Sequence, residues 1–196
     1  KYNYNSRNPE YDWGFGRQVI GETWRPREGA GHYGKNHKYS TRMFVVPGQK
    51  DHPVMRGVKD MHAMCGAYSA VPIEGSVILG KNQVLDSMKP DGKPLPGKPP
   101  SPCIWVREYD SKSGKKGRVF ASTQGASQDI VSEGYRRCII NGVFWCMGME
   151  SKIKGDMNVD FVGPYQPTKF SFGGGRKKVK PSDLVGFESP LLPEKK

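Results

Sequence analysis

Residues 118–150 constrain the fold more than any other part of the chain. They combine a strand-like run, RVFAST, with a polar turn around Gly125 and an amphipathic run that begins near Ser132. A strand, a tight glycine turn and a helix in this order are typical of open α/β sheets, where ligands bind at the carboxyl end of a strand beside the positive end of a helix. The segment therefore predicts an α/β fold and the location of a site.

The helix expected after this turn begins near Ser132 or Glu133 and ends at Gly148. Its apolar positions recur at intervals of four, four and three residues, which predicts a buried stripe of Tyr135, Ile139, Val143 and Cys146. Two strand-like runs precede it, at 103–109 and 117–123, and the short loop between them is rich in Gly and Lys. This pattern predicts a β-hairpin.

The rest of the chain is less regular. Short strands are expected at 42–46 and 76–79, and a glycine-weakened helix at 13–24. The apolar face of that helix would consist of Phe15, Val19 and Ile20. Residues 87–102 hold six prolines and no periodicity, which predicts an exposed loop inserted within one domain.

Length and charge narrow the classes of partner. A chain of 196 residues can bury one substantial core, and no apolar run approaches the ~20 residues that span a bilayer, so we expect a soluble protein without a membrane partner. The chain begins with lysine, which we interpret as a fragment or a processed product. The net charge of +12 is spread as +5, +1, +2 and +4 over successive quarters, and its densest run, 176–180, lies in a Gly-rich tail. This distribution favours a solvated basic surface over a nucleic-acid groove.

No motif indicates a metal or a cofactor. The four cysteines lack zinc-finger spacing, and Cys138 and Cys146 would lie ~12 Å apart along the expected helix, too far for a disulfide. We expect all four to be buried as small apolar side chains. His32 and His37 share a loop without fixed geometry, and the chain has no Walker loop, nucleophile elbow or dinucleotide fingerprint. We therefore expect no metal site and no cofactor.

Two groups of polar residues suggest where a ligand could bind. Glu22, Trp24 and His32 lie within eleven residues, and an aromatic ring beside charged groups suits a polyhydroxylated ligand such as a sugar. The alternative is a Trp that packs on the core beside surface charges. At the glycine turn, Ser127 either binds a ligand or caps the following turn, and Asp129 is the rival cap.

The order of several sequence blocks resembles the ThuA-like (trehalose utilisation) family, and most closely its planctomycete-type branch. The blocks are FGRQVIGETW, GHYGK, HPVMRGVKD, the hairpin run that ends in GRVFASTQGASQD, EGYRRCIINGVFWCMGME and VGPYQPTKFSFGGG. The resemblance covers roughly residues 10–180, and the ordered succession is more specific than any single block.

This resemblance implies a class I glutamine amidotransferase-like fold, which is a three-layer flavodoxin-like α/β sandwich. Residues 1–162 would form the C-terminal two-thirds of that domain, N-terminally incomplete and with an added β-hairpin, and 163–196 an irregular Gly/Pro/Lys-rich tail that packs on it. Many relatives carry Gly-His where this chain has Gly125-Ala126, and the amidotransferase Cys-His-Glu triad is not identifiable. The loss of an imidazole weakens the case for catalysis more than the case for the fold.

We therefore expect a ThuA-like protein of carbohydrate utilisation that processes or binds a sugar or an oxidised sugar derivative. The predicted site residues are His32 and Glu22 as acid/base groups and Trp24, Arg42, Gln124 and Ser127 as ligand-binding groups. An enzyme of this kind would be a sugar-processing hydrolase or isomerase. The alternatives are a non-catalytic carbohydrate-binding or scaffold module and, more weakly, a basic nucleic-acid-binding protein.

Overall fold

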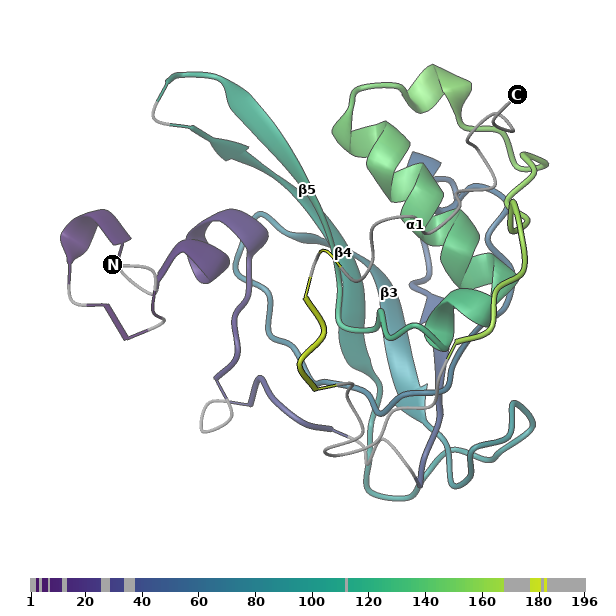
Figure 1. Cartoon of the computed structure of the whole chain (residues 1–196). Helices are drawn as coiled ribbons and strands as arrows, with labels where there is room; N and C mark the ends of the chain where they lie inside the picture. Colours follow the sequence, from purple (N-terminus) through teal and green to yellow (C-terminus); the bar gives the residue numbers. More distant parts are fainter. Residues whose placement is uncertain are drawn as a thin grey trace.

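The computed structural model describes residues 3, 5–6, 8–11, 14–25, 29–33, 38–111, 113–167, 177–180 and 182. Its centre is a five-stranded sheet in the order β2-β1-β3-β4-β5, in which all neighbouring strands are antiparallel (Figure 1). The strands are β1 Thr41–Val45, β2 Met61–Ala63, β3 Val77–Val84, β4 Ser101–Asp110 and β5 Lys116–Ser122.

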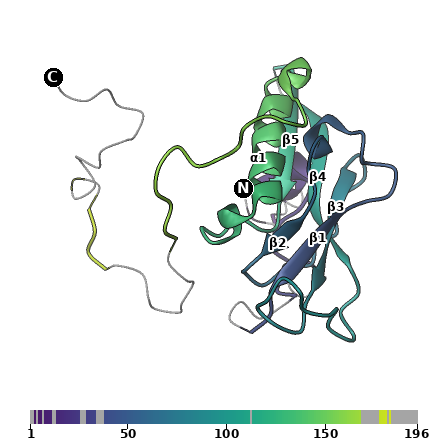
Figure 2. The ribbon, with the colours of Figure 1, turned by 90° about the vertical axis from the view of Figure 1, so that its right-hand side faces the viewer.

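One α-helix, α1 Glu133–Cys146, packs along one face of this sheet, as the two perpendicular views show (Figures 1 and 2). The other helical segments of the described residues are short: η1 Pro9–Tyr11, the π-helical turn η2 Gly16–Ile20, η4 Pro53–Met55, η5 Asp129–Val131 and η6 Glu150–Lys152. None of the helices within the described ranges has the length and apolarity needed to cross a membrane.

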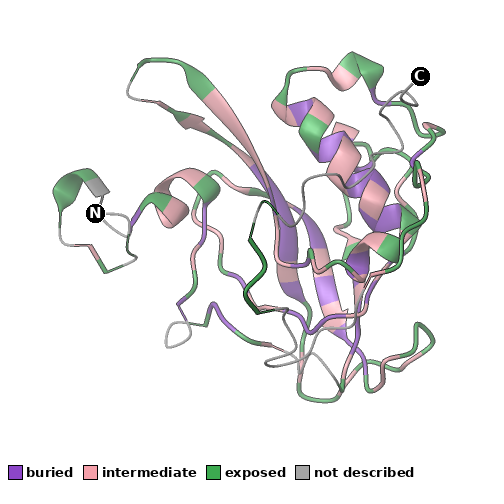
Figure 3. Cartoon of the chain, in the orientation of Figure 1, coloured by how far each residue is buried: buried purple, intermediate pink, exposed green. Residues whose placement is uncertain are grey.

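The main core lies between α1 and the sheet, where buried residues line the strands and the inward side of the helix (Figure 3). The buried helix residues include Tyr135, Cys138, Asn141, Gly142 and Trp145. The predicted stripe is therefore wrong at Val143, which is 51% exposed, while Ile139 and Cys146 are only partly buried. Gly142 explains the difference, because a side chain there would begin 2.5 Å from the Phe120 ring of β5, so the helix approaches the sheet through its glycine.

The opposite face of the sheet carries a smaller apolar cluster. Trp105 of β4 and Ala121 of β5 pack there with Ala70. Irregular chain covers this face, since the indole Nε1 of Trp105 donates to the carbonyl of Ile20 at the end of η2 (2.8 Å) and η2 contacts β5. The candidate site described below lies on this second face.

The general prediction of a mixed α/β chain is confirmed, as are the hairpin of β4 and β5, the strands at β1 and β3, and the Pro-rich loop up to residue 100. The flavodoxin-like three-layer sandwich is not confirmed. Such a sandwich has a mostly parallel sheet between two layers of helices, whereas the described strands pair antiparallel and α1 covers only one face. The short edge strand β2 was not predicted.

The expectations for the N-terminal helix and for the cysteines were partly wrong. The helical segment ends at Ile20 because Gly21 is left-handed (φ 96°), and Phe15 and Ile20 are exposed rather than buried. Trp13, at the start of the predicted helix, lies outside the described residues. All four cysteines are free, and all except the partly buried Cys146 are buried.

Candidate functional site

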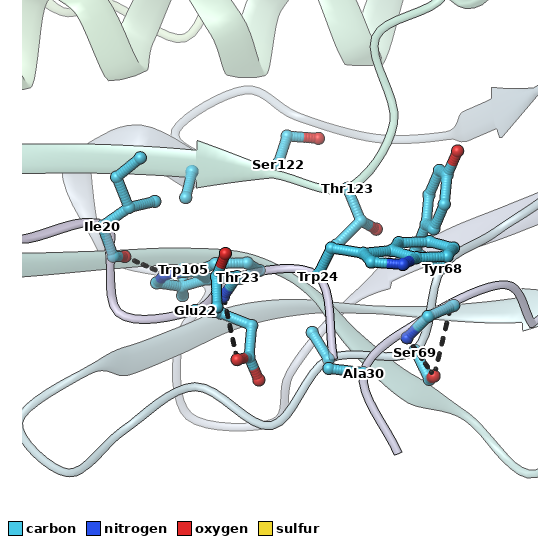
Figure 4. Close-up of a pocket in the computed structure, with 13 residues that line it drawn as sticks. Ile20, Glu22, Thr23, Trp24, Ala30, Tyr68, Ser69, Trp105, Ser122 and Thr123 are labelled. Atoms are coloured by element: carbon cyan, nitrogen blue, oxygen red, sulfur yellow. Dashed lines mark hydrogen bonds between the residues drawn. The ribbon is translucent and has the colours of Figure 1, made fainter. Parts of the chain in front are cut away.

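A pocket of about 210 Å³ opens on the second face of the sheet, where β5 ends (Figure 4). We call it the strand-end pocket. The N-terminal loop, the loop after β2 and the two hairpin strands form its walls. Its lining residues are Ile20, Glu22, Thr23, Trp24, Ala30, Gly31, Tyr68, Ser69, Ala70, Trp105, Ala121, Ser122 and Thr123. The pocket therefore lies at the carboxyl end of β5, where the sequence predicted a site; ligand binding there stays a prediction.

Backbone pairing fixes the N-terminal loop against this pocket. Arg25 and Ala30 exchange both backbone hydrogen bonds (2.7 and 3.2 Å), and His32 forms an isolated bridge with Tyr68. These contacts close the loop and bring Trp24 to the rim.

Glu22 is held by five donors at the base of this loop. Its Oε1 accepts from Arg17, Arg25 and the Thr23 N–H at 2.9–3.1 Å, and its Oε2 accepts from Arg25 (3.3 Å) and the Val71 N–H (2.7 Å). A carboxylate offers about four lone-pair sites, so these donors occupy its acceptor capacity. The surroundings of Glu22 therefore favour a structural anchor over an acid/base group.

Three aromatic rings form a cluster beside the pocket. Trp24 meets His32 edge-on at 4.7 Å and Tyr68 at 5.5 Å, and His32 stacks on Tyr68 at 5.1 Å between ring centroids. Trp24 is 45% exposed, so a large part of its indole is open to a ligand. His32 is exposed and contacts the two rings, but it is not among the residues that line the pocket.

Asp129 organises the glycine turn that follows β5. Its buried carboxylate accepts from the N–H groups of Gly125 (3.2 Å), Ala126 (3.1 Å) and Cys65 (3.1 Å). Of the two rival caps, Asp129 therefore holds the turn. Ser127 is exposed and lies outside the strand-end pocket; its carbonyl accepts from the Tyr165 hydroxyl (2.7 Å).

Gln124 lies behind the pocket wall and is only 7% exposed. Its Oε1 accepts from the hydroxyl of Thr123 (3.0 Å), which lines the pocket, while its Nε2 is buried without a partner among the described residues. The Tyr135 phenol donates to the Gln124 carbonyl, and burial raises the pKa of that phenol, so it stays protonated as a donor. The side-chain amide of Gln124 thus contacts the pocket residue Thr123, and its N–H groups have no hydrogen-bond acceptor among the described residues.

The structure does not bring Arg42 to this pocket. Arg42 lies on β1, where its Nη2 donates to the Pro90 carbonyl (2.6 Å) and its Nε is 3.4 Å from Asp60. It is close to His62, whose pKa is lowered by burial and by the charge of Arg42. His62 lines a separate pocket of about 440 Å³ at the start of α1.

Sequence reasoning missed Tyr68, Ser69 and Trp105 as pocket residues, because they come from segments far from the N-terminal loop. The one available signal was Trp105, a large ring with a polar N–H in an otherwise apolar strand run. No group of three or more His, Cys, Asp or Glu side chains that could hold a metal occurs within the described ranges. Compared with known proteins, the chain matches no family model, no curated protein and no solved structure.

Proposed function

We propose that the strand-end pocket binds a single sugar ring. The observation that carries this proposal is the exposed indole of Trp24 at the rim of a pocket that also presents Tyr68 and the hydroxyls of Thr23 and Thr123. Aromatic faces pack on the C–H surfaces of a sugar, and hydroxyl groups exchange hydrogen bonds with its edge. The volume of about 210 Å³ lies below the roughly 300–1,000 Å³ of sites for drug-sized ligands, which suits one ring.

The surroundings of the predicted catalytic residues favour binding over turnover. Glu22 is occupied by its five donors, His32 contacts two aromatic rings, and Ala126 supplies no imidazole at the turn. The acid/base roles of Glu22 and His32 stay predictions. Sugar binding in the pocket does not require these acid/base roles.

We further propose that the chain is a ThuA-like protein of carbohydrate utilisation. The order of its sequence blocks supports this assignment, and the pocket chemistry agrees with a sugar ligand. The flavodoxin-like sandwich that the assignment implies rests on the same blocks; the described antiparallel sheet does not provide its parallel strands.

Calorimetric titration with a panel of neutral, keto and acidic monosaccharides tests the binding function. We expect at least one monosaccharide to bind to the wild-type chain and Trp24→Ala to abolish the heat signal. Phe44→Ala is the matched control, because Phe44 is also an exposed aromatic residue (38%) but lies on β1 outside the pocket. The proposal fails if no sugar binds or if both variants lose affinity equally.

A further inference from the structure

Thr123 is a pocket residue whose hydroxyl group has a fixed direction. It directly follows β5, and its backbone N–H donates to the carbonyl of Cys103 on the neighbouring strand (2.9 Å). Thr123 lines the strand-end pocket, and its hydroxyl points toward the indole of Trp24 (Figure 4). A ligand that packs on this indole therefore lies within reach of the Thr123 hydroxyl.

The proton of this hydroxyl is already used within the protein. Thr123 Oγ1 donates to the side-chain carbonyl Oε1 of Gln124, 3.0 Å away. A carbonyl oxygen only accepts, and a threonine hydroxyl has a single proton, so this bond leaves Thr123 with its lone pairs alone. Within the described part of the chain no other group donates to them. Toward the pocket, Thr123 is thus a hydrogen-bond acceptor.

Gln124 is held firmly enough to keep the Thr123 proton in place. Its backbone N–H donates to the Ser122 hydroxyl (3.2 Å), and its backbone carbonyl accepts from the Tyr135 phenol. The residue is only 7% exposed, so its side chain has little room to turn away. The acceptor polarity of Thr123 is therefore built into the turn after β5.

Neighbouring polar groups of the pocket wall do not reverse this polarity. The Ser69 hydroxyl donates to a carbonyl of the N-terminal loop (2.6 Å), and the Glu22 carboxylate can only accept. The hydroxyls of Thr23 and Tyr68 can turn to donate or to accept. A ligand group beside Thr123 therefore has to supply the proton, whatever it meets elsewhere on the wall.

We propose that the strand-end pocket selects a neutral sugar that donates one ring hydroxyl to Thr123, and that Gln124 fixes this polarity. This inference rests on the proposed sugar-binding function and names its ligand class. A carboxylate, an ether oxygen or a fluorine in the same place can only accept, so it would face the Thr123 lone pairs with no proton between them, and affinity would fall. Gln124 acts through Thr123 and is a positioning residue.

Titration calorimetry with glucose, galactose, mannose and fructose, each compared with its monodeoxyfluoro derivatives, tests this inference. Exchange of a hydroxyl for fluorine changes the size little and removes the proton. In the wild type we expect one ring position at which fluorine weakens binding at least about fivefold. Thr123→Val should weaken binding of the parent sugar and reduce this fluorine penalty to less than about twofold, whereas Thr123→Ser should keep it.

Gln124→Met separates a fixed polarity from an ordinary hydroxyl contact. It frees the Thr123 proton to turn toward the ligand, so the fluorine penalty should fall to less than about half of its wild-type value. Gln124→Glu keeps an acceptor oxygen and should keep the penalty. If Gln124 had only a structural role, its substitution would change the affinities for the parent sugar and the fluoro sugar by the same factor.

A fluorine penalty that is absent at every position in the wild type, or unchanged in Gln124→Met, would overturn the inference and leave the sugar-binding function in place. Binding of acidic sugars alone would have the same meaning. Loss of the penalty in Gln124→Glu would overturn the inference as well, so it stays testable if the methionine variant does not fold. Absence of binding by every neutral and acidic sugar would instead refute the function itself.

Discussion

The buried carboxylate of Asp129 accepts a hydrogen bond from the backbone N–H of Cys65, 3.1 Å away. This contact ties the turn after β5 to the loop after β2, and that loop supplies Tyr68, Ser69 and Ala70 to the strand-end pocket. The geometry of the pocket therefore depends on a side chain that does not line it.

Asp129→Ala should be strongly destabilising. It leaves the buried N–H of Cys65 without its acceptor, at a cost of about 1–3 kcal/mol, and the loss of the part-buried hydrogen bonds from Gly125 and Ala126 adds to this cost. Urea unfolding should show a loss of roughly 3 kcal/mol or more, and a smaller loss for Asp129→Asn, whose amide oxygen still accepts. Asp156→Ala, at an exposed aspartate, should change the stability by less than about 0.5 kcal/mol. Similar values for the two alanine variants would contradict this role for Asp129.

Glu22→Ala should destabilise the N-terminal loop, because the buried Arg25 would lose its ion pair with Glu22 and the N–H groups of Thr23 and Val71 would lose their acceptor. The side chains of Glu22 and Arg25 are each only 6% exposed, and removal of one partner of a buried pair typically costs about 3–5 kcal/mol. Chemical denaturation measures the loss, and Glu74→Ala, on the exposed loop before β3, serves as the neutral control. If the Glu22→Ala protein is as stable as the wild type, Glu22 is not a structural anchor, and the acid/base role predicted from the sequence is favoured instead.

His52 should make the protein less stable as the pH falls. Its Nδ1 accepts from the Val54 N–H (3.2 Å), and burial lowers its pKa, partly offset by Glu150. The unfolded imidazole binds a proton near pH ~6.5, before the folded one does, so this contribution is complete above that pH and is lost as the pH falls toward the folded pKa. His62, whose pKa is also lowered, should add to the slope.

His52→Asn isolates the contribution of His52, because asparagine is a good N-cap that accepts the same hydrogen bond and does not titrate. Thermal unfolding at a series of pH values should give a shallower acid slope for this variant, and the difference should disappear above about pH 7.5. Identical slopes for the two proteins would refute the assignment.

Gly142→Ala should destabilise α1, although alanine is the better helix former by about 1 kcal/mol. The new Cβ would stand 2.5 Å from the Phe120 ring, and overpacking of this kind costs about 1–3 kcal/mol. The same substitution in a Phe120→Ala background should become neutral or stabilising. A four-protein unfolding cycle measures this coupling, and additive effects would contradict it.

Local patterns were sufficient to predict four of the five strands and α1, but not the short strand β2 or the arrangement of the sheet. Alternating apolar runs and a Gly- and Lys-rich loop indicated β4 and β5, and the run after Ser132 indicated α1. Strand direction and order depend on contacts distant in sequence, such as the pairing of β1 with both β2 and β3. The buried face of α1 was misjudged for a similar reason, since the close approach of Gly142 to Phe120 leaves no periodic signal.

The candidate site was predictable in its location and only partly in its residues. A pocket does lie at the end of β5, where the glycine turn led us to expect a site, and Trp24 and Glu22 line it, whereas the turn residue Gln124 does not. Arg42 and Ser127 lie outside the pocket. Tyr68 and Trp105 line it only because the chain folds back over the second face of the sheet. The Glu22 carboxylate also accepts a hydrogen bond from the backbone N–H of Val71, which lies 49 residues away in the sequence. Sequence spacing does not reveal such a contact.

The most direct test of the central claim is a sugar titration followed by the indole N–H resonances of the tryptophans, assigned with single Trp→Phe variants. Trp24 and Trp105 line the strand-end pocket, whereas Trp145 lies on α1 against Arg118 and serves as an internal reference. We predict that the Trp24 and Trp105 signals shift and saturate together while the Trp145 signal stays in place. Unchanged Trp24 and Trp105 signals at saturating sugar, or an equal shift of Trp145, would contradict sugar binding at this pocket.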